Sequence, residues 1–149
     1  TPERAASLLD ALERGAPPID GAWLELGSGT GIGSALLAPR VGSLMCTDLA
    51  AEMLRHAPDV APRVRADAVA LPFPDDSFDA LVLVKMLLFP HEVDRVLRGN
   101  GAVVWVNTQG DQTPIHLPAA DVLDALPGEW TGVSARAGTG TWLVARRSV

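Results

Sequence analysis

Cysteine and lysine are almost missing from this chain of 149 residues, in which Cys46 and Lys85 are the only examples of each. A single cysteine cannot form an intrachain disulfide, and it cannot build a cysteine metal cluster. No paired histidines or clustered acids replace such a cluster, so we expect no metal site. A chain without disulfides suits a reducing compartment, and we expect a cytoplasmic location.

Positive charge and long apolar runs are also scarce. The chain has 12 Lys and Arg against 18 Asp and Glu, a formal net charge of −6, and its arginines occur as scattered pairs. Nucleic-acid affinity comes largely from Lys and Arg that neutralise phosphates, so we expect no nucleic-acid partner. The longest apolar run, residues 80–90, contains Lys85 and is too short to span a bilayer, so we expect no membrane partner.

What the chain does have is the composition of a globular domain, with 48% hydrophobic and 20% charged residues. Its length suits one domain, which we expect to span residues 1–149. Helical and strand-like segments alternate along it, which predicts an α/β fold with a mostly parallel sheet. The oligomeric state stays open.

The local patterns predict the following elements, from hydrophobic periodicity and from the glycines and prolines that end each segment. The expected helices are 1–15, 32–37, 49–56, 92–97 and 119–126. The expected strands are 22–26, 43–47, 63–66, 78–84, 102–107, 130–136 and 141–147. We expect a turn at 99–101 and a short glycine-rich hairpin link at 137–140.

The strongest local signal is a glycine-rich turn between the first strand and the helix that follows it. It reads Glu25-Leu26-Gly27-Ser28-Gly29-Thr30-Gly31. Glycines allow a sharp bend and let the main chain approach a ligand closely. The bend also leaves amide N–H groups facing the crevice at the carboxyl edge of the sheet, where ligands of such sheets bind.

The spacing of these glycines separates possible cofactors. The dinucleotide pattern G-x-G-x-x-G needs a glycine at position 32 or 34, where Ile32 and Ser34 stand. This disfavours a nucleotide-dependent oxidoreductase. No Gly-Lys pair of a phosphate-binding loop occurs, and no G-x-S-x-G elbow surrounds Ser28.

Two carboxylates follow the next two strands. Asp48 lies roughly 20 residues beyond the glycine turn, where a carboxylate can accept hydrogen bonds from ribose hydroxyls. Asp67, followed by Ala68, comes after the third strand and can meet an adenine amino group. Each acid alone could be a simple cap of the next segment. Their order and spacing after the glycine turn favour a nucleoside ligand.

These motifs together resemble the class I S-adenosylmethionine (SAM)-dependent methyltransferases, most closely the branch that methylates small molecules. The resemblance covers residues 19–107. It rests on Glu25–Gly31, on Asp48-Leu49 with Met53-Leu54, on Asp67-Ala68 with 71–73 and 76–79, and on 95–101. It implies a Rossmann-like, mostly parallel seven-stranded sheet with helices on both faces and an antiparallel C-terminal hairpin strand. It also implies methyl transfer from SAM to a small molecule by in-line displacement.

The resemblance assigns cofactor roles to individual residues. Glu25 and the turn of Gly27, Ser28, Gly29, Thr30 and Gly31 would hold the methionine end of SAM. Asp48 would bind the ribose, with Leu49 and Met53 near the adenosine. Asp67 and Ala68 would meet the adenine edge, and Lys85 would lie near the sulfonium and the substrate.

The catalytic residues are less defined. His91, in the segment after the fourth strand, is the best candidate for a general base, and Lys85 is a second candidate. Residues 107–109, after the fifth strand, could line the substrate pocket. The short segment from Lys85 to Glu92 leaves an alternative open, in which the chain is a non-catalytic partner or sensor that binds SAM or S-adenosylhomocysteine.

Overall fold

The computed structural model describes residues 2–27, 32–56, 59–108 and 117–148. Ser28, Gly29, Thr30, Gly31 and Gln109 therefore lie outside the described residues. The strands are β1 (Ala22–Leu26), β2 (Ser43–Asp48), β3 (Arg63–Arg65), β4 (Phe78–Val84), β5 (Leu97–Asn107), β6 (Trp130–Ala137) and β7 (Gly140–Arg147). The helices are α1 (Pro2–Arg14), α2 (Ile32–Leu37), α3 (Ala51–His56), α4 (Pro90–Val96) and α5 (Ala119–Ala125).

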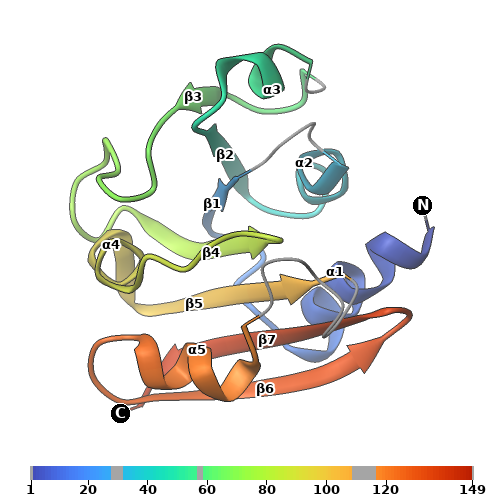
Figure 1. Ribbon diagram of the computed structural model, residues 1–149, viewed down its shortest axis with the longest axis vertical. Coiled ribbons are helices and arrows are strands. Elements are labelled where there is room, and N and C mark those ends of the chain that lie inside the picture. Colours follow the sequence, from blue (N-terminus) through green and yellow to red (C-terminus); the bar gives the residue numbers. More distant parts are fainter. Residues whose placement is uncertain (1, 28–31, 57–58, 109–116, 149) are drawn as a thin grey trace.

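The described strands form one sheet in the order β3-β2-β1-β4-β5-β7-β6 (Figure 1). The pairs from β3 to β5 are all parallel, and β7 runs antiparallel to both β5 and β6. The expected fold class is confirmed. The chain moves outward from β1 to β2 and β3, then returns to β4 on the other side of β1. This reversal between β1 and β4 is the place where open α/β sheets bind ligands.

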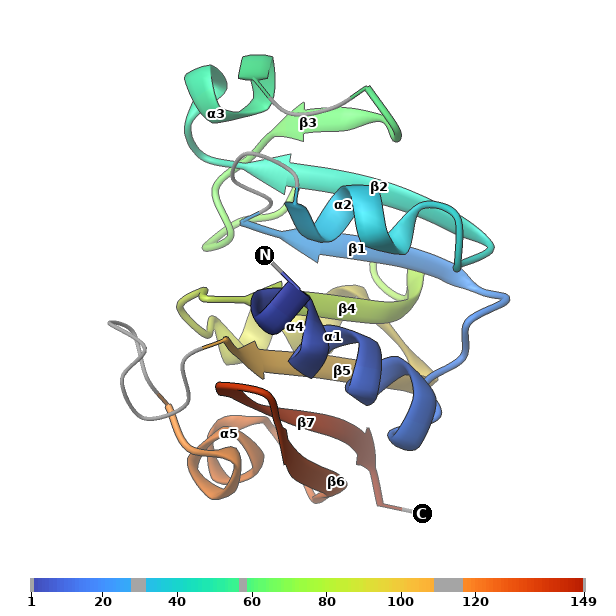
Figure 2. The same cartoon turned by 90° about the vertical axis from the view of Figure 1, so that its right-hand side faces the viewer.

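Helices cover both faces of the sheet because the central strands are apolar on both sides, as parallel strands are. One core cluster joins Leu8 and Ala11 of α1 and Leu37 of α2 to the sheet. The opposite cluster joins Val93 of α4 and Val122 of α5 to the other face. Figure 2 shows α1 and α2 in front of the sheet and α4 behind it.

The structure corrects several local expectations. The turn expected at 99–101 is wrong, because these residues lie within β5. They form an irregularity in the β4–β5 pairing, where Phe78 pairs with Leu97 but Ala80 pairs with Ala102. Helix α4 begins at Pro90 instead of Glu92, since proline suits a first helical position. Helix α3 begins at 51 instead of 49, after a turn that the Asp48 side chain holds.

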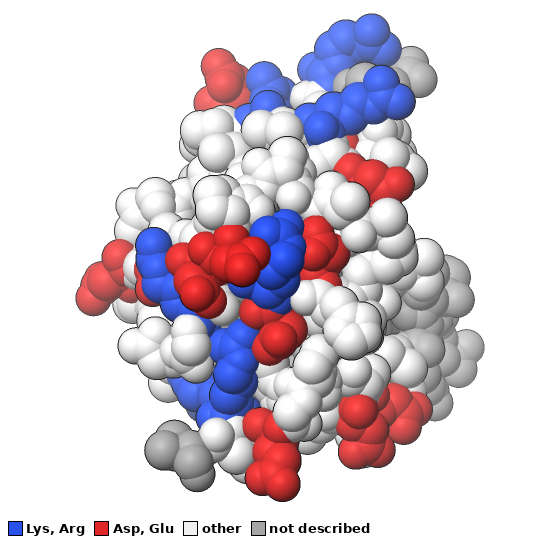
Figure 3. All heavy atoms as spheres, turned by 90° about the vertical axis from the view of Figure 1, so that its left-hand side faces the viewer, with Lys and Arg blue, Asp and Glu red and all other residues white. Residues whose placement is uncertain are grey.

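Arginines on the face over α4 are compensated by carboxylates, and Figure 3 shows the two charges interleaved there. Arg95 pairs with Asp75 and Glu92, and the Arg147 guanidinium lies 2.7 Å from an Asp94 oxygen. The hydrogen bond from Arg95 lowers the pKa of Glu92. Among the helices of the described residues, none is both long and apolar enough to cross a membrane.

Candidate functional site

A cavity of about 310 Å³ opens at the carboxyl ends of β1, β2, β3 and β4, beside the reversal in strand order. We call it the strand-end cavity. Its walls are Gly27, Thr47, Asp48, Leu49, Ala66, Asp67, Ala68, Lys85, Met86, Leu87 and Phe89. Four successive strand ends therefore contribute to one space, as the parallel topology requires.

Gly27 begins the turn after β1 with a φ of +67°, a conformation that glycine adopts without steric cost. A Cβ atom at this position would lie 2.6 Å from the Met86 sulfur, which is closer than real Cβ contacts come. The main chain of Gly27 is therefore packed directly against the segment that follows β4. Any larger residue at position 27 must push Met86 away from its place in the cavity wall.

Glu25, on strand β1, is only 2% exposed. Its carboxylate accepts a hydrogen bond of 2.6 Å from the Ser34 hydroxyl of α2, and its main-chain oxygen accepts one from Thr47. The other carboxylate oxygen would contact a Cβ at Gly33, so helix α2 begins directly against Glu25. Burial raises the pKa of Glu25 to about 7, although the Ser34 hydrogen bond opposes the rise. Glu25 is not a wall residue of the cavity, and its hydrogen bonds tie β1 to α2 and β2.

The two acids stand at neighbouring strand ends in the cavity wall. Asp48 accepts a hydrogen bond of 2.9 Å from the Ala50 N–H, and Asp67 accepts one of 3.0 Å from the Val69 N–H. Each contact uses one carboxylate oxygen and fixes the turn after its strand. The capping role weighed for these acids is therefore present, and it coexists with their position in the wall of the cavity.

The rest of the wall is mostly apolar. Leu49 and Leu87 are 60% and 54% exposed, which is high for leucine and leaves them available to a flat apolar ligand. Phe89 and Ala68 complete this surface. Carboxylates that accept hydrogen bonds, beside an apolar wall and a bare glycine main chain, suit a ligand with hydroxyl groups, an amino group and a flat ring.

Some expected site residues do not reach this cavity. Met53 is 45% exposed on α3 and is not part of the wall. His91 is exposed on the first turn of α4, and it too is absent from the wall. Lys85 does line the cavity, in a left-handed conformation with a φ of +53°.

Five wall residues were not expected from the sequence: Thr47, Ala66, Met86, Leu87 and Phe89. They carry no motif of their own. The signal that could have found them is positional, because each directly adjoins or follows the end of a parallel strand, and such ends share one edge of the sheet. Asn107 follows the same rule at the end of β5, but it lines a different cavity.

Comparison with known proteins identifies the family to which the chain belongs. Residues 24–105 match a family described as a methyltransferase domain. A demethylmenaquinone methyltransferase from Clavibacter sepedonicus is 34% identical over 108 residues, which cover 63% of this chain and 44% of the relative. The chain thus spans less than half the length of that relative.

Solved structures share the fold over nearly the whole chain. A chain in the complex between the Haloferax volcanii Trm112 methyltransferase activator and a putative methyltransferase has a TM-score of 0.78 and 15% identity, with 99% of this chain and 92% of that chain covered. A SAM-dependent methyltransferase from Aquifex aeolicus has a TM-score of 0.73 and 16% identity, with 97% and 92% covered. At these identities the likeness concerns the fold.

Proposed function

Because the chain belongs to the methyltransferase domain family and its cofactor is SAM, we propose that it transfers the SAM methyl group to a small-molecule acceptor. The observation that carries this proposal is the convergence of Gly27, Asp48 and Asp67 on the strand-end cavity. These residues follow three different strands, and a nucleoside joined to an amino acid needs both a bare main chain and carboxylates around it.

The wall residues divide among the parts of this cofactor. We assign the ribose hydroxyls to Asp48 and the adenine edge to Asp67 and Ala68, with Leu49 against the base. We assign the methionine end to Gly27 and the rest of the glycine turn, and Glu25 ties the strand before that turn to α2 and β2 through Ser34 and Thr47. Lys85 stands on the acceptor side of the cavity, at the end of β4.

SAM supplies a methyl group on a sulfonium, which is already activated for in-line displacement. The task left to the chain is alignment of the acceptor nucleophile with that methyl group. A general base is needed only when the acceptor must lose a proton. The wall of the strand-end cavity contains no histidine, so in this proposal His91 takes no direct part in the displacement.

Calorimetric titration of SAM into the wild-type chain, Asp48→Ala and Asp124→Ala tests the cofactor site. Asp48→Ala should weaken SAM binding by roughly tenfold or more, since hydrogen bonds to charged groups are worth about 1.5–3 kcal/mol. Asp124 is exposed on α5, away from the strand-end cavity, and its variant should bind like the wild type. Absence of both heat and thermal stabilisation with SAM in the wild type would refute the proposal.

Transfer of a radiolabelled methyl group separates the possible acceptors. We expect label from SAM to appear in the small-molecule fraction of a metabolite extract. Label found only in protein or nucleic acid would exclude a small-molecule acceptor. Tight SAM binding with label in no fraction would favour the alternative, a non-catalytic protein that binds SAM. The short connection between β4 and α4 is the observation behind this alternative.

A further inference from the structure

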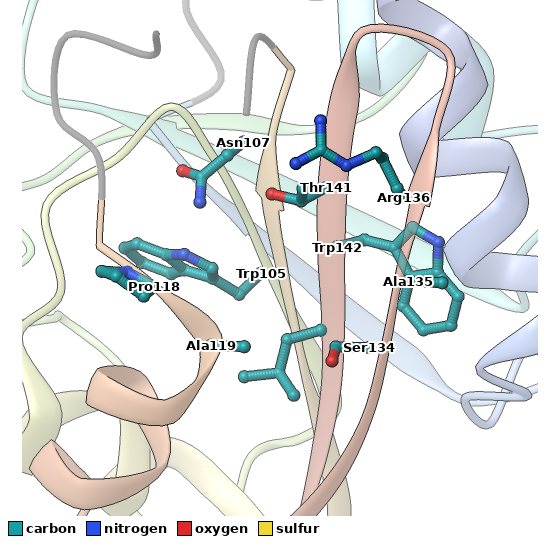
Figure 4. Close-up of a pocket in the computed structure, with 10 residues that line it drawn as sticks. Trp105, Asn107, Pro118, Ala119, Ser134, Ala135, Arg136, Thr141 and Trp142 are labelled. Atoms are coloured by element: carbon teal, nitrogen blue, oxygen red, sulfur yellow. The ribbon is translucent and has the colours of Figure 1, made fainter. Parts of the chain in front are cut away.

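A second cavity of about 280 Å³ lies between the start of α5 and the β6–β7 hairpin, at the carboxyl end of β5. We call it the hairpin cavity (Figure 4). The indole of Trp105 and the ring of Pro118 form flat apolar walls on the α5 side. Leu143 adds a further apolar side chain to the wall. None of its wall residues belongs to the strand-end cavity.

Asn107 places an unpaired acceptor in this region. Its side chain is 2% exposed, and its amide nitrogen donates to the Leu117 main-chain oxygen at 3.2 Å. The Trp105 indole N–H donates to the same Leu117 oxygen. Because a main-chain oxygen can only accept, the atom of the Asn107 amide that faces it must be the nitrogen. The amide oxygen is left with no hydrogen-bond partner among the described residues. Such a buried group is costly, and in a cavity wall it points to a ligand donor.

An arginine stands opposite this amide. The register pairs Asn107 with Thr141, and Thr141 with Arg136, so the three side chains form one row on the same face of the sheet. Figure 4 shows the Arg136 guanidinium extended across Thr141 toward Asn107. Arg136 is the only charged residue in the wall, and it makes no ion pair or hydrogen bond within the described part of the chain.

The two cavities meet at adjacent strand ends. The Lys85 main-chain N–H donates to the Val106 oxygen at 3.2 Å. Lys85 lines the strand-end cavity, while the residues on either side of Val106, Trp105 and Asn107, line the hairpin cavity. A molecule held in the hairpin cavity therefore lies next to the acceptor side of the cofactor.

From this geometry we infer that the hairpin cavity binds the acceptor, and that the acceptor is a small carboxylic acid with a flat apolar body. The carboxylate pairs with Arg136, the flat body lies on Trp105, and a hydroxyl or amino group donates to the Asn107 oxygen. A guanidinium favours a carboxylate because it can donate two parallel hydrogen bonds. This inference rests on the proposed function and names the substrate class of that same site.

Two isosteric probes test the inference on the full chain. 4-Hydroxybenzoate carries the carboxylate, the ring and the hydroxyl. 4-Hydroxybenzamide has the same ring and hydroxyl, with a neutral amide in place of the carboxylate. Ligand-observed NMR titration should show the benzoate binding about tenfold more tightly than the benzamide. Arg136→Gln should abolish this preference, while Arg40→Gln, on the exposed loop before β2, should keep it.

Thr141→Val supplies a variant that spares the buried Asn107. It should weaken both probes by a few fold, because it removes a hydroxyl from the same row and keeps a β-branched strand residue. SAM titration of every variant runs in parallel. Normal SAM binding with no benzoate binding, with equal binding of the two probes, or with an unchanged preference in Arg136→Gln would overturn the inference alone. Failure of the wild type to bind SAM would instead refute the proposed function.

Discussion

The two cavities at the carboxyl edge of the sheet are built in different ways. The strand-end cavity takes main-chain turns and acids from four parallel strands, so its wall residues follow one another in short segments. The hairpin cavity depends on antiparallel register, which brings Asn107, Thr141 and Arg136 into one row from three strands. One region is shaped by backbone turns and the other by side-chain pairing.

The difference explains which region has freedom to change. Gly27 tolerates few substitutions, because its main chain has a positive φ and packs directly against Met86 in the cavity wall. A row of side chains on a hairpin can be exchanged without altering the fold. We therefore expect the strand-end cavity to determine the cofactor and the hairpin cavity to determine the acceptor, and the predictions below test that division.

The largest expected effect is a pH dependence of the free energy of unfolding that the Glu25 carboxyl group causes. Its pKa is about 7 in the folded chain and 4.5 in the reference state. The folded state therefore keeps a proton that the unfolded state loses between these values. The contribution of Glu25 to the free energy of unfolding is greatest below pH 4.5. It falls by about 3 kcal/mol as the pH rises to 7 and is constant at higher pH.

Urea unfolding of wild type and Glu25→Gln between pH 5 and 8 measures this effect. The variant keeps the oxygen that accepts from Ser34, mimics the protonated acid, and should lose the slope. Exposed Glu13→Gln is the matched control and should keep it. A stability difference between wild type and Glu25→Gln that does not change with pH would contradict the prediction. Carboxyls with a lowered pKa, such as Asp79, affect both proteins equally.

The next effect separates backbone conformation from cavity shape at two glycines. Gly27 and Gly128 have φ values of +67° and +87°, so alanine at either position should cost about 1 kcal/mol of stability. Only at Gly27 does the new Cβ meet Met86, while at Gly128 no atom lies within 4 Å. The Met86 side chain can move to make room for the new Cβ atom. The substitution should therefore change the shape of the cavity that Met86 lines.

We therefore expect Gly27→Ala to weaken SAM binding by roughly tenfold, an effect of about 1.4 kcal/mol, and Gly128→Ala to leave it unchanged. Thermal unfolding and calorimetric titration of both variants provide the comparison. Equal SAM affinities in the two variants would mean that the shape of the turn at Gly27 does not matter to the cofactor.

The two regions also differ in what the sequence predicts. Strands β1 and β4 and helix α2 have the expected bounds, because apolar runs between glycines and prolines define them. Gly27, Asp48 and Asp67 line one cavity, because parallel strands place their carboxyl ends at one edge of the sheet. Local spacing therefore contains most of the information about the strand-end cavity.

The hairpin cavity was not predictable in the same way. Nothing near Asn107 in the sequence identifies Thr141 or Arg136 as neighbours, since only the antiparallel register brings them together. The strand around Gly99 was missed for a related reason. Glycines predict a turn, but here the Asp79 carboxylate accepts from both the Ala22 N–H and Arg98, which holds an irregular strand in place.

The smallest expected effect concerns Lys85, which stands at the border of the two cavities. Its φ of +53° costs a non-glycine residue about 1–2 kcal/mol, whereas glycine adds about 0.4–1 kcal/mol of unfolded-state entropy. Lys85→Gly should therefore stabilise the chain by about 0.5 kcal/mol, and Lys85→Ala, which keeps the strain, should change stability little. Asp76→Gly, at a φ of +55° away from both cavities, is the control for the backbone effect.

Methyl transfer by the same variants then decides what the strained lysine does. Strained residues persist where the surrounding structure and the function require them. A Lys85→Gly chain that is more stable but slower, with Lys85→Ala equally slow, would assign the ammonium group to the acceptor. If the glycine variant were slow and the alanine variant normal, the left-handed backbone would be what positions the segment after β4. Lower stability of Lys85→Gly than of Lys85→Ala would show that the left-handed conformation costs less than the unfolded-state entropy that glycine adds, and would contradict the predicted stabilisation.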